Sequence, residues 1–288
     1  MSVRYRTFKT YLDTCLTEEE IRSVHSSFDL IGDIAIVKIP YDLTNKKYEI
    51  ADAIISCIPR IRLVTMVTGE TSDLYRIRKL EILRGDGSTE TVYKESGCSF
   101  KLDVSKVFFS PRLSYERGRI AGMTGAKETI INMFSGVGTF SIIIAKKNPD
   151  VKVYSIDINS YAYGYMVENV KSNHLENIVI PKLGDAREVI QNEGMVGFAD
   201  RVLMPLPDTA CEFLDIAIPT LKRGGILHYF DTAYLTSSDK KSDLFQGPIE
   251  EVGMVAGNMG RSLEIKNKRV LRSVGPRKYH IVIDAKIS

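Results

Sequence analysis

The second half of the chain alternates short apolar runs with stretches in which apolar residues recur at helical spacing. This alternation is typical of parallel strands joined by crossover helices that cover both faces of a sheet. Two later apolar runs flank the turn sequence Gly-Pro-Arg-Lys, so we expect them to pair as an antiparallel hairpin at the sheet edge. The expected strands are 129–134, 151–158, 177–184, 200–206, 224–231, 263–274 and 279–287.

Between these strands the helical periodicity is equally clear. The expected helices are 138–148, 160–174, 186–194 and 209–223, with another in the second half of 236–260. The pattern therefore predicts an α/β domain built on a Rossmann-like, seven-stranded sheet.

The first hundred residues mix helical runs with short strands and predict a smaller α+β domain. Helices are expected at 17–29 and 48–60, and strands at 33–39, 75–85, 89–97 and 98–104. The polar sequence Arg-Gly-Asp-Gly-Ser-Thr separates the second and third of these strands and predicts a β-hairpin. We expect the small domain at 1–105 and the large one at 106–288.

Composition adds limits to this picture. The chain has 288 residues, 44% of them hydrophobic, and no window approaches the roughly 18 uncharged apolar residues that span a bilayer. The N-terminal sequence lacks the apolar core of a secretion signal, so we expect a cytoplasmic protein without a membrane partner. The four cysteines form no CxxC pair and the four histidines show no ligand spacing, so we expect reduced thiols and no metal.

Positive charge is concentrated at the C-terminal end. From Arg261 onward there are eight Lys or Arg and two Asp or Glu, within totals of 39 and 36 for the chain. A basic face of this kind suits a phosphate backbone, although a solvated hairpin with an ordinary excess of lysine explains it equally well.

The sequence Phe-Ser-Gly-Val-Gly-Thr-Phe-Ser joins the first strand of the large domain to its helix. Gly136 and Gly138 allow the chain to turn sharply and bring its backbone N–H groups against a ligand. A dinucleotide fingerprint has a third glycine where this chain has Ser141, so the pattern argues against NAD.

Two carboxylates follow the next two strands. Asp157 ends the second strand, where it can accept the hydroxyls of a ribose, and Asp185 follows the third, where it can accept from the amine of adenine. Together with the glycines, these acids indicate an adenosyl ligand without a pyrophosphate, which favours S-adenosylmethionine. The alternative is that both acids merely cap the helices that follow them.

Seven sequence blocks in order resemble the archaeal and eukaryotic tRNA guanosine-37 N1-methyltransferases and their relatives in wyosine biosynthesis. The blocks are 107–122, 131–146, 156–159, 183–189, 199–207, 224–231 and 270–287, and 28–40 matches as well. The resemblance implies a class I methyltransferase fold that transfers a methyl group from S-adenosylmethionine to the purine beside the anticodon. It implies cofactor-binding residues at Phe134, Gly136, Gly138, Asp157, Ile158, Asp185 and Ala186.

Methylation of guanine N1 requires loss of its proton, which calls for a base and for a cation that stabilises the charge on O6. Glu116 matches the family's proposed general base, and Arg112 lies four residues before it, on the same face if the segment is helical. Arg78 matches the region of the O6-stabilising residue, with Arg76 as the alternative. Without the resemblance, Arg112 and Glu116 would be interpreted as a surface ion pair worth about 0.3–0.5 kcal/mol.

The chain departs from the family where the target base is bound. The family usually has an asparagine at the place of Pro205, and proline supplies neither a side-chain amide nor an N–H. We expect Pro205, Leu206 and Pro207 to form the base pocket. The departure makes methylation of C7 of the wyosine precursor 4-demethylwyosine plausible as an additional activity.

The resemblance also implies how tRNA is recognised. Several archaeal relatives carry an extra N-terminal domain that contacts the tRNA elbow, and the 27 residues before Phe28 are too few for one. We therefore expect a monomer that recognises the anticodon stem-loop through its basic hairpin. The cations proposed for phosphate contacts are Arg261, Lys266, Lys268, Arg269, Arg272, Arg277 and Lys278. The alternatives are an aminocarboxypropyl transferase of the same fold and a catalytically silent tRNA-binding module.

Overall fold

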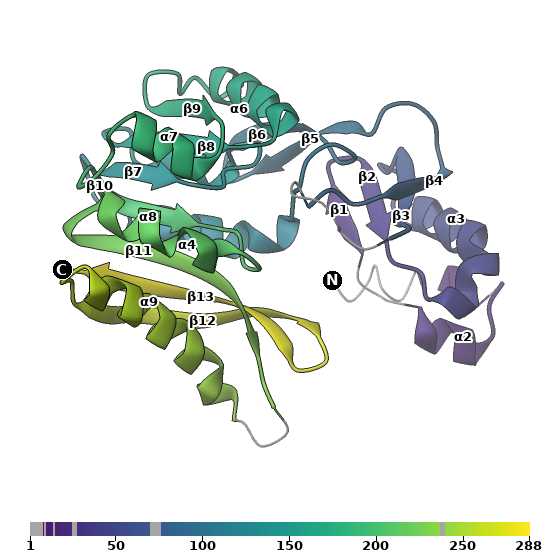
Figure 1. Ribbon diagram of the computed structural model, residues 1–288. Helices are drawn as coiled ribbons and strands as arrows, with labels where there is room; N and C mark the ends of the chain where they lie inside the picture. Colours follow the sequence, from purple (N-terminus) through teal and green to yellow (C-terminus); the bar gives the residue numbers. More distant parts are fainter. Residues whose placement is uncertain (1–7, 9, 14, 25–27, 70–75, 237–239) are drawn as a thin grey trace. The chain divides into compact units, whose positions relative to one another are not determined.

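Figure 1 shows the computed structural model, which describes the chain except residues 1–7, 9, 14, 25–27, 70–75 and 237–239. The chain forms two compact units, Met1–Ser114 and Tyr115–Ser288. The Rossmann-like sheet lies in the second unit and the smaller α+β fold in the first.

The larger unit contains a seven-stranded sheet in the order β12-β13-β11-β10-β7-β8-β9. Five strands are parallel: β7 (Thr129–Asn132), β8 (Lys152–Asp157), β9 (Val179–Leu183), β10 (Ala199–Met204) and β11 (Leu221–Tyr234). β12 (Leu263–Gly275) and β13 (Lys278–Ile287) form an antiparallel hairpin in which β13 pairs with β11. The structure confirms the strands and the edge hairpin predicted from the sequence.

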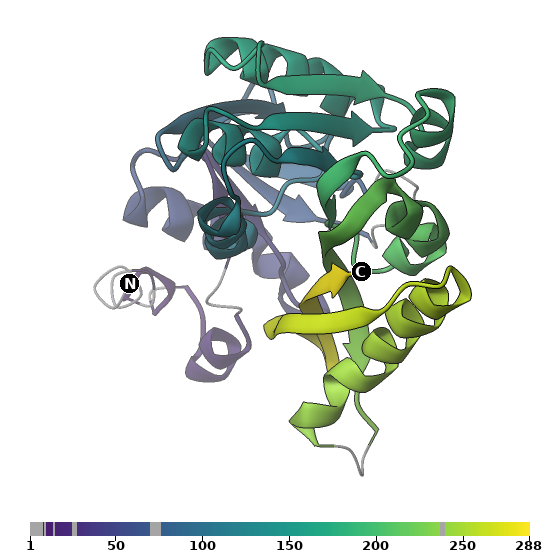
Figure 2. The same cartoon turned by 90° about the vertical axis from the view of Figure 1, so that its left-hand side faces the viewer.

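Helices cover both faces of this sheet (Figures 1 and 2). α7 (Ala186–Asn192), α8 (Leu214–Thr220) and α9 (Gln246–Asn258) contribute to the core on one face, with the short 3₁₀ helices η3 (Ala210–Phe213) and η4 (Lys241–Phe245). α5 (Thr139–Lys147), α6 (Ser160–Ser172) and α4 (Ser114–Met123) lie on the other. This arrangement follows because right-handed crossovers to strands on opposite sides of β7 place their helices on opposite faces.

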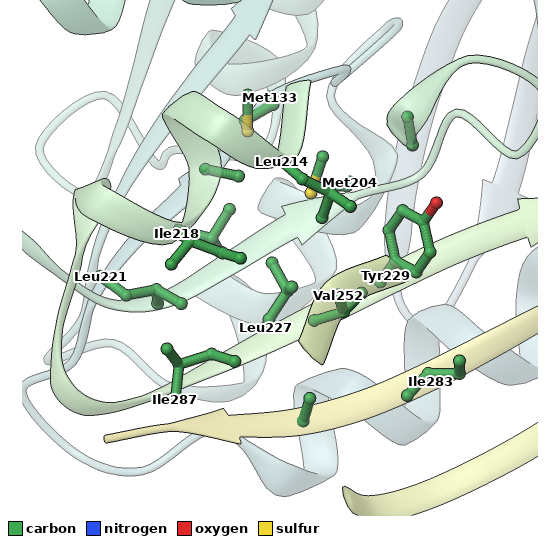
Figure 3. Packing of buried hydrophobic residues seen from close by; sticks show 14 of the residues in the cluster. Met133, Met204, Leu214, Ile218, Leu221, Leu227, Tyr229, Val252, Ile283 and Ile287 are labelled. Atoms are coloured by element: carbon green, nitrogen blue, oxygen red, sulfur yellow. The ribbon is translucent and has the colours of Figure 1, made fainter. Parts of the chain in front are cut away.

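Alternation along β11 shows why its apolar run is continuous. Tyr229 points into the core with Val252 of α9 and Ile283 of β13 (Figure 3). The next residue, Phe230, packs edge-on against Phe140 of α5 on the opposite face, with ring centroids 5.8 Å apart. Because both faces are covered here, the successive residues 227–230 of the strand are all buried.

The smaller unit has a four-stranded sheet and a separate two-stranded one. β1 (Asp29–Ile31), β2 (Ile34–Val37), β3 (Leu63–Val67) and β4 (Leu80–Arg84) pair in that order, and β5 (Glu90–Glu95) pairs with β6 (Cys98–Asp103). Its helices are α2 (Glu18–Ser23), α3 (Lys47–Cys57), η1 (Tyr41–Lys46) and η2 (Pro111–Leu113). α2 begins with a capping box between Thr17 and Glu20, as its Thr-x-x-Glu sequence predicts.

The β-hairpin predicted at Arg-Gly-Asp-Gly-Ser-Thr is wrong. β4 pairs with β3 and β5 with β6, so Gly85 and Gly87, with φ of +86° and +87°, lead the chain from one sheet to the other. The tight hairpin lies one strand later, where Ser96 and Gly97 have φ of +51° and +74°. Positive φ at both central residues is what a type I′ turn requires.

Candidate active site

The chain reverses its direction of strand addition at β7, because β8 and β9 lie on one side of it and β10 on the other. Ligands of doubly wound sheets bind at the carboxyl ends of the strands beside such a switch point. The glycine turn follows β7 and Pro205 follows β10, and the two segments start side by side, since the Met133 N–H donates to the Leu203 carbonyl over 3.0 Å. The topology therefore brings the predicted cofactor and base segments together.

The glycine turn needs both of its glycines. Gly136 has φ of +55° and Gly138, the N-cap residue of α5, has φ of +87°. A Cβ atom on Gly138 would lie 3.0 Å from Cγ of Met166 and 3.2 Å from Cδ1 of Ile142. No side chain caps α5, so the first N–H groups of the helix remain for backbone acceptors, water or a ligand.

Ser141 replaces the third glycine of a dinucleotide fingerprint and has a packing role of its own. Its hydroxyl accepts a hydrogen bond from the Asn132 side-chain amide over 3.1 Å, and both residues are fully buried. The bond ties α5 to β7. This position therefore stabilises the helix–strand contact with a small polar residue.

Asp157 ties the glycine turn to the next strand. One carboxylate oxygen accepts the Gly136 N–H over 2.6 Å and the other accepts the Asn159 N–H over 2.9 Å. Burial raises the pKa of Asp157, and the two backbone N–H groups oppose that rise. Each oxygen keeps a second acceptor position, so both can still receive ribose hydroxyls.

The capping interpretation is confirmed for Asp185 and wrong for Asp157. Asp185 is the N-cap of α7 and accepts the Arg187 N–H over 2.7 Å, which leaves its second carboxylate oxygen for a ligand. The N-cap of α6 is Asn159, whose side chain accepts the Tyr161 N–H over 3.0 Å. Asp157 therefore carries out no capping that would explain its position.

Apolar groups surround these acids. Ile158 is 37% exposed directly after Asp157, and Ala186 is buried at the start of α7. Phe134 is half-buried and packs edge-on against Phe213, with ring centroids 5.0 Å apart. An exposed aliphatic side chain directly after Asp157 suits the face of an adenine ring.

Pro205, Leu206 and Pro207 are half-buried at the end of β10. The Leu206 carbonyl accepts the Ala210 N–H over 2.9 Å, which fixes the loop. Beside it, Thr232 donates to the carboxylate of Asp208 over 2.7 Å.

Asp231 next to this loop is a residue that sequence reasoning missed. Burial, together with the nearby Glu251 carboxylate, raises the pKa of Asp231 to about 6. Its position at the end of the predicted strand 224–231 and near the expected base pocket was the available signal.

Glu116 lies in the first turn of α4 and is only 3% exposed. Its Oε2 atom accepts from Nε of Arg119 over 2.7 Å. Nε of Arg269 lies 3.1 Å from its Oε1 atom, yet Oε1 receives no aligned hydrogen bond. The arginine fork lies over the Tyr115 ring, 4.5 Å from its centroid. One oxygen of the carboxylate is therefore held, and the other has an unused acceptor position.

Within the smaller unit, Arg78 and Arg112 share one carboxylate. Asp29 is 7% exposed and accepts from Nη1 of Arg78 over 3.0 Å and from Nε of Arg112 over 2.8 Å. These contacts hold the pKa of Asp29 below its usual range against the opposing effect of burial. The alternative residue, Arg76, has φ of +56° and its guanidinium lies 5.7 Å from the Phe108 ring centroid. Asp29 was not predicted, because nothing local in the sequence links it to either arginine.

The helical condition on which Arg112 and Glu116 were expected to share a face is not met. Arg112 lies in the 3₁₀ turn η2, and α4 begins only at Ser114. The alternative, a surface ion pair between Arg112 and Glu116, is not formed either. Arg112 pairs with Asp29, and Glu116 pairs with Arg119 and Arg269.

The basic hairpin is less uniform than its sequence suggests. Arg261 points inward and donates to the carbonyls of Ile218 and Leu221 over 2.8 and 2.7 Å. Arg269 faces Glu116, whereas Lys268 lies on the side of η4, 5.4 Å from the Phe245 ring centroid. Of the other proposed cations, Lys266, Lys268 and Arg277 are exposed, and Arg272 and Lys278 are half-buried.

A doubly wound sheet with a Gly-x-Gly turn, an acid on each of the next two strand ends and no third glycine defines a class I methyltransferase that uses S-adenosylmethionine. Comparison with known proteins makes the assignment specific. The TRM5/TYW2 methyltransferase domain matches residues 91–263, and the TYW2 N-terminal domain matches residues 8–89. The chain belongs to the TRM5/TYW2 methyltransferase family.

Three relatives show the range of activities in the family. The tRNA (guanine(37)-N(1))-methyltransferase Trm5b of Pyrococcus abyssi is 39% identical over 94% of this chain and 78% of its own length. The tRNA 4-demethylwyosine(37)-methyltransferase Taw21 of Saccharolobus solfataricus is 37% identical over 93% and 96%. A tRNA(Phe) (4-demethylwyosine(37)-C(7)) aminocarboxypropyltransferase of Methanocaldococcus jannaschii is 35% identical over 90% and 97%.

Solved structures agree with this assignment. The crystal structure of P. abyssi Trm5b matches 94% of this chain and 78% of its own, with a TM-score of 0.83 and 38% identity. A complex of aTrm5 with tRNALeu matches 98% and 78%, with a TM-score of 0.81 and 33% identity. M. jannaschii TYW2 in complex with AdoMet matches 91% and 99%, with a TM-score of 0.69 and 31% identity. The chain is thus a tRNA-modifying methyltransferase with S-adenosylmethionine as its cofactor.

In the described part of the chain, every helix is too short or too polar to cross a membrane.

Proposed function

We propose that this protein transfers a methyl group to N1 of guanosine 37, beside the anticodon of tRNA. The observation that carries the proposal is Glu116, a carboxylate with 3% exposure whose Oε1 atom lies near Arg269 but accepts no aligned hydrogen bond from any residue that the structure describes. A buried carboxylate with a free acceptor position is suited to remove a proton from a base that enters the site. Guanine N1 carries such a proton, whereas adenine N1 does not.

The remaining roles follow from charge. Once N1 is deprotonated, negative charge spreads to O6, and a fixed guanidinium there stabilises the transition state by roughly 3 kcal/mol in a dry site. We assign this role to Arg78 and a supporting role to Arg112, since both are held by the buried carboxylate of Asp29. Arg76, which contacts Phe108, is the alternative.

The cofactor site is assigned to the turn and strand ends of the larger unit. Asp157 would hold the ribose hydroxyls and Asp185 the adenine amine, with apolar contacts from Phe134, Ile158 and Ala186. Gly136 and Gly138 allow the backbone to approach the ligand. When bound, S-adenosylmethionine supplies an electrophilic methyl group; the protein orients it and excludes water.

We expect the enzyme to act as a monomer. It would bind its substrate tRNA through the anticodon stem-loop. We assign phosphate contacts first to Lys266, Lys268 and Arg277, the exposed cations of the β12–β13 hairpin. Base contacts are assigned to Pro205, Leu206 and Pro207. Residues 1–105 would form a domain that helps to bind the tRNA substrate. Residues 106–288 would form the catalytic domain, which binds the cofactor and contains the general base Glu116.

A second activity, methylation of C7 of 4-demethylwyosine, is favoured by one observation. Pro205 presents a carbonyl and no side-chain amide to the base, so the pocket does not select guanine by an amide hydrogen bond. The relative Taw21 has this second substrate in its name. Transfer of the aminocarboxypropyl group is the alternative within the same fold.

The test uses two unmodified tRNA transcripts, one with G and one with A at position 37, incubated with S-adenosylmethionine. Mass analysis of nucleosides should show one added methyl group on the G37 transcript and none on the A37 transcript. Equal methylation of both would contradict the role of Glu116. An aminocarboxypropyl increment on tRNA that carries the wyosine precursor would select the alternative, and tRNA binding without any turnover would indicate a silent binding module.

A further inference from the structure

Behind Glu116, a chain of charged side chains runs through the interior of the larger unit. Three of its members stand on adjacent strands: Arg201 on β10, His228 on β11 and Asp284 on β13, with exposures of 4%, 0% and 1%. The sheet register places His228 directly opposite Asp284. These charged or polar side chains are buried among apolar residues of the sheet, which is unusual and requires an explanation.

The protonation state of His228 follows from its neighbours. Nη1 of Arg201 lies 2.6 Å from Nε2 of His228, and an arginine can only donate. Nε2 must therefore accept, and the ring proton is on Nδ1, which donates to Oδ1 of Asp284 over 2.5 Å. Burial also lowers the pKa of His228, so the ring is neutral. The far side of Arg201 is fixed by a bidentate contact with Glu128, at 2.7 and 2.9 Å.

Asp284 is saturated with donors. Besides His228, it accepts from both terminal nitrogens of the Arg119 fork and from the Asn267 amide over 3.1 Å. These partners hold the pKa of Asp284 well below its usual range, so the carboxylate is ionised at any pH used in an assay. A bidentate fork on a fixed carboxylate has one orientation.

That orientation decides where Glu116 points. With both terminal nitrogens of Arg119 on Asp284, its Nε–H is directed at Oε2 of Glu116, 2.7 Å away. The side chain of Arg119 is 11% exposed, so water does not compete strongly for it. The network thus ties down one oxygen of Glu116 and leaves Oε1 as the proton acceptor.

Stability alone is a weak explanation for these charges. Replacing a buried ion network with apolar side chains of similar volume often leaves stability unchanged or higher. In these contacts the carboxylates of Glu116, Asp284 and Glu128 are paired with the guanidiniums of Arg119, Arg269 and Arg201. Paired charges of this kind hold the side chains in a fixed geometry.

We propose that Asp284 and His228 are positioning residues for the methyl-transfer reaction, and that they act on Glu116 through Arg119. The inference rests on the proposed role of Glu116 as the general base. A carboxylate displaced by about 1 Å can lose about 100-fold in rate. Disturbing the network should therefore slow proton removal without weakening either substrate.

The test compares Asp284→Asn and Arg119→Lys with the same substitutions in another Asp–Arg ion pair of the protein. Asp52 and Arg84 form an exposed bidentate contact at 2.6 and 2.9 Å, so Asp52→Asn and Arg84→Lys are the controls. Single-turnover methylation of the G37 transcript is measured at saturating S-adenosylmethionine, with the cofactor Kd from calorimetry and the folded fraction from circular dichroism. We expect both network variants to lose tenfold or more in the maximal rate, with KM for tRNA and cofactor Kd within twofold of wild type, and the controls to lose nothing.

A crystal structure of the Arg119→Lys variant separates this proposal from the proposed function. Lysine keeps the charge but cannot contact both carboxylates as a fork, so the Glu116 carboxylate should turn away from its wild-type position. An unmoved Glu116, or a rate that falls only in proportion to the folded fraction, would overturn the positioning role. The position of Glu116 in the crystal structure tests the positioning role even if the wild-type protein methylates no guanosine. That absence of methylation would contradict the proposed function instead. Should Asp284→Asn fail to fold, Asn267→Ala removes one donor to Asp284 and should give a smaller loss in the same direction.

Discussion

At the residue scale, the two carboxylate oxygens of Glu116 differ: Oε2 accepts from Arg119, whereas Oε1 is proposed to accept the proton of the base. This proposal can be tested by substitution. Glu116→Gln keeps the shape of the side chain and removes its ability to take a proton. Methyl transfer to G37 should fall by about 10²–10⁴-fold, while the affinity for S-adenosylmethionine stays the same. Single-turnover kinetics and calorimetry measure the two quantities. Glu176→Gln, which changes an exposed acid of the same unit, is the control; a wild-type rate in Glu116→Gln would show that the base lies elsewhere.

Asp231 makes a prediction about stability and pH. Its pKa is raised from 3.8 to about 6 in the folded protein, so the unfolded chain loses its proton first as the pH rises. The free energy of unfolding should therefore decrease between about pH 4 and pH 6 and stay level above that. Asparagine has no such dependence and keeps the oxygen that accepts the Thr232 N–H.

Asp231→Asn should accordingly be more stable than wild type at pH 7.5, by about 1–2 kcal/mol after allowance for partial exposure. The difference should shrink as the pH falls from 6 to 4 and vanish below that. Chemical denaturation at a series of pH values measures it. A difference that is independent of pH would mean that burial and the nearby Glu251 carboxylate do not raise the pKa of Asp231.

Much of the candidate site could be predicted from the sequence, because its residues follow strands directly. Gly136, Asp157 and Asp185 were proposed in this way. The pairing of Arg112 with Asp29 spans 83 positions, and that of His228 with Asp284 spans 56. Hydrophobic periodicity shows which positions are buried, but it does not show which distant polar groups meet there.

At the scale of elements, the β12–β13 hairpin divides its cations between two sides. Arg269 faces Glu116, while the exposed residues of β12 alternate on the other side, among them Lys266 and Lys268. A strand has this property because successive side chains point to opposite faces. The C-terminal excess of positive charge therefore serves two purposes, and only part of it is available to a phosphate backbone.

This division can be measured through the salt dependence of tRNA binding. Lys266→Ala and Arg277→Ala each remove an exposed cation of the hairpin. Each should weaken tRNA binding and reduce the slope of log Kd against log salt by about one, since one phosphate contact is lost. Lys146→Ala, at an exposed position of α5, should leave the slope unchanged. Unchanged slopes in both hairpin variants would show that the tRNA backbone lies elsewhere.

Elements differ in how well the pattern predicts them. The strands from β7 to β11 were each predicted, and β7, β10 and the middle of β11 are mostly buried. β4 has only one buried residue, Leu83, in its five, so its sequence does not reveal its partner. The turn after it contains good hairpin residues, yet β4 pairs with β3 and β5 pairs with β6. The turn residues alone therefore do not decide which strands pair.

At the scale of the whole molecule, the residues proposed for catalysis are distributed over both compact units. Glu116 and all proposed cofactor residues belong to the larger unit, whereas Arg78, Arg112 and their shared carboxylate Asp29 belong to the smaller one. Substitutions in the smaller unit should therefore change the rate of methyl transfer and leave the affinity for S-adenosylmethionine unchanged. This separation distinguishes a role in chemistry from a role in cofactor binding.

A double-mutant cycle of Asp29 and Arg78 tests whether the two residues act together on the rate of methyl transfer. Arg78→Ala should lower the single-turnover rate by about 10²–10³-fold, as the loss of one charge-stabilising donor does. Asp29→Asn should cost less, because it loosens both arginines and removes neither. If Asp29 acts only by holding Arg78, adding Asp29→Asn to Arg78→Ala should slow the reaction little further. A strictly additive loss would mean that Asp29 acts through Arg112 or on its own. A fall in cofactor affinity in either single variant would contradict the assignment of the smaller unit to the substrate.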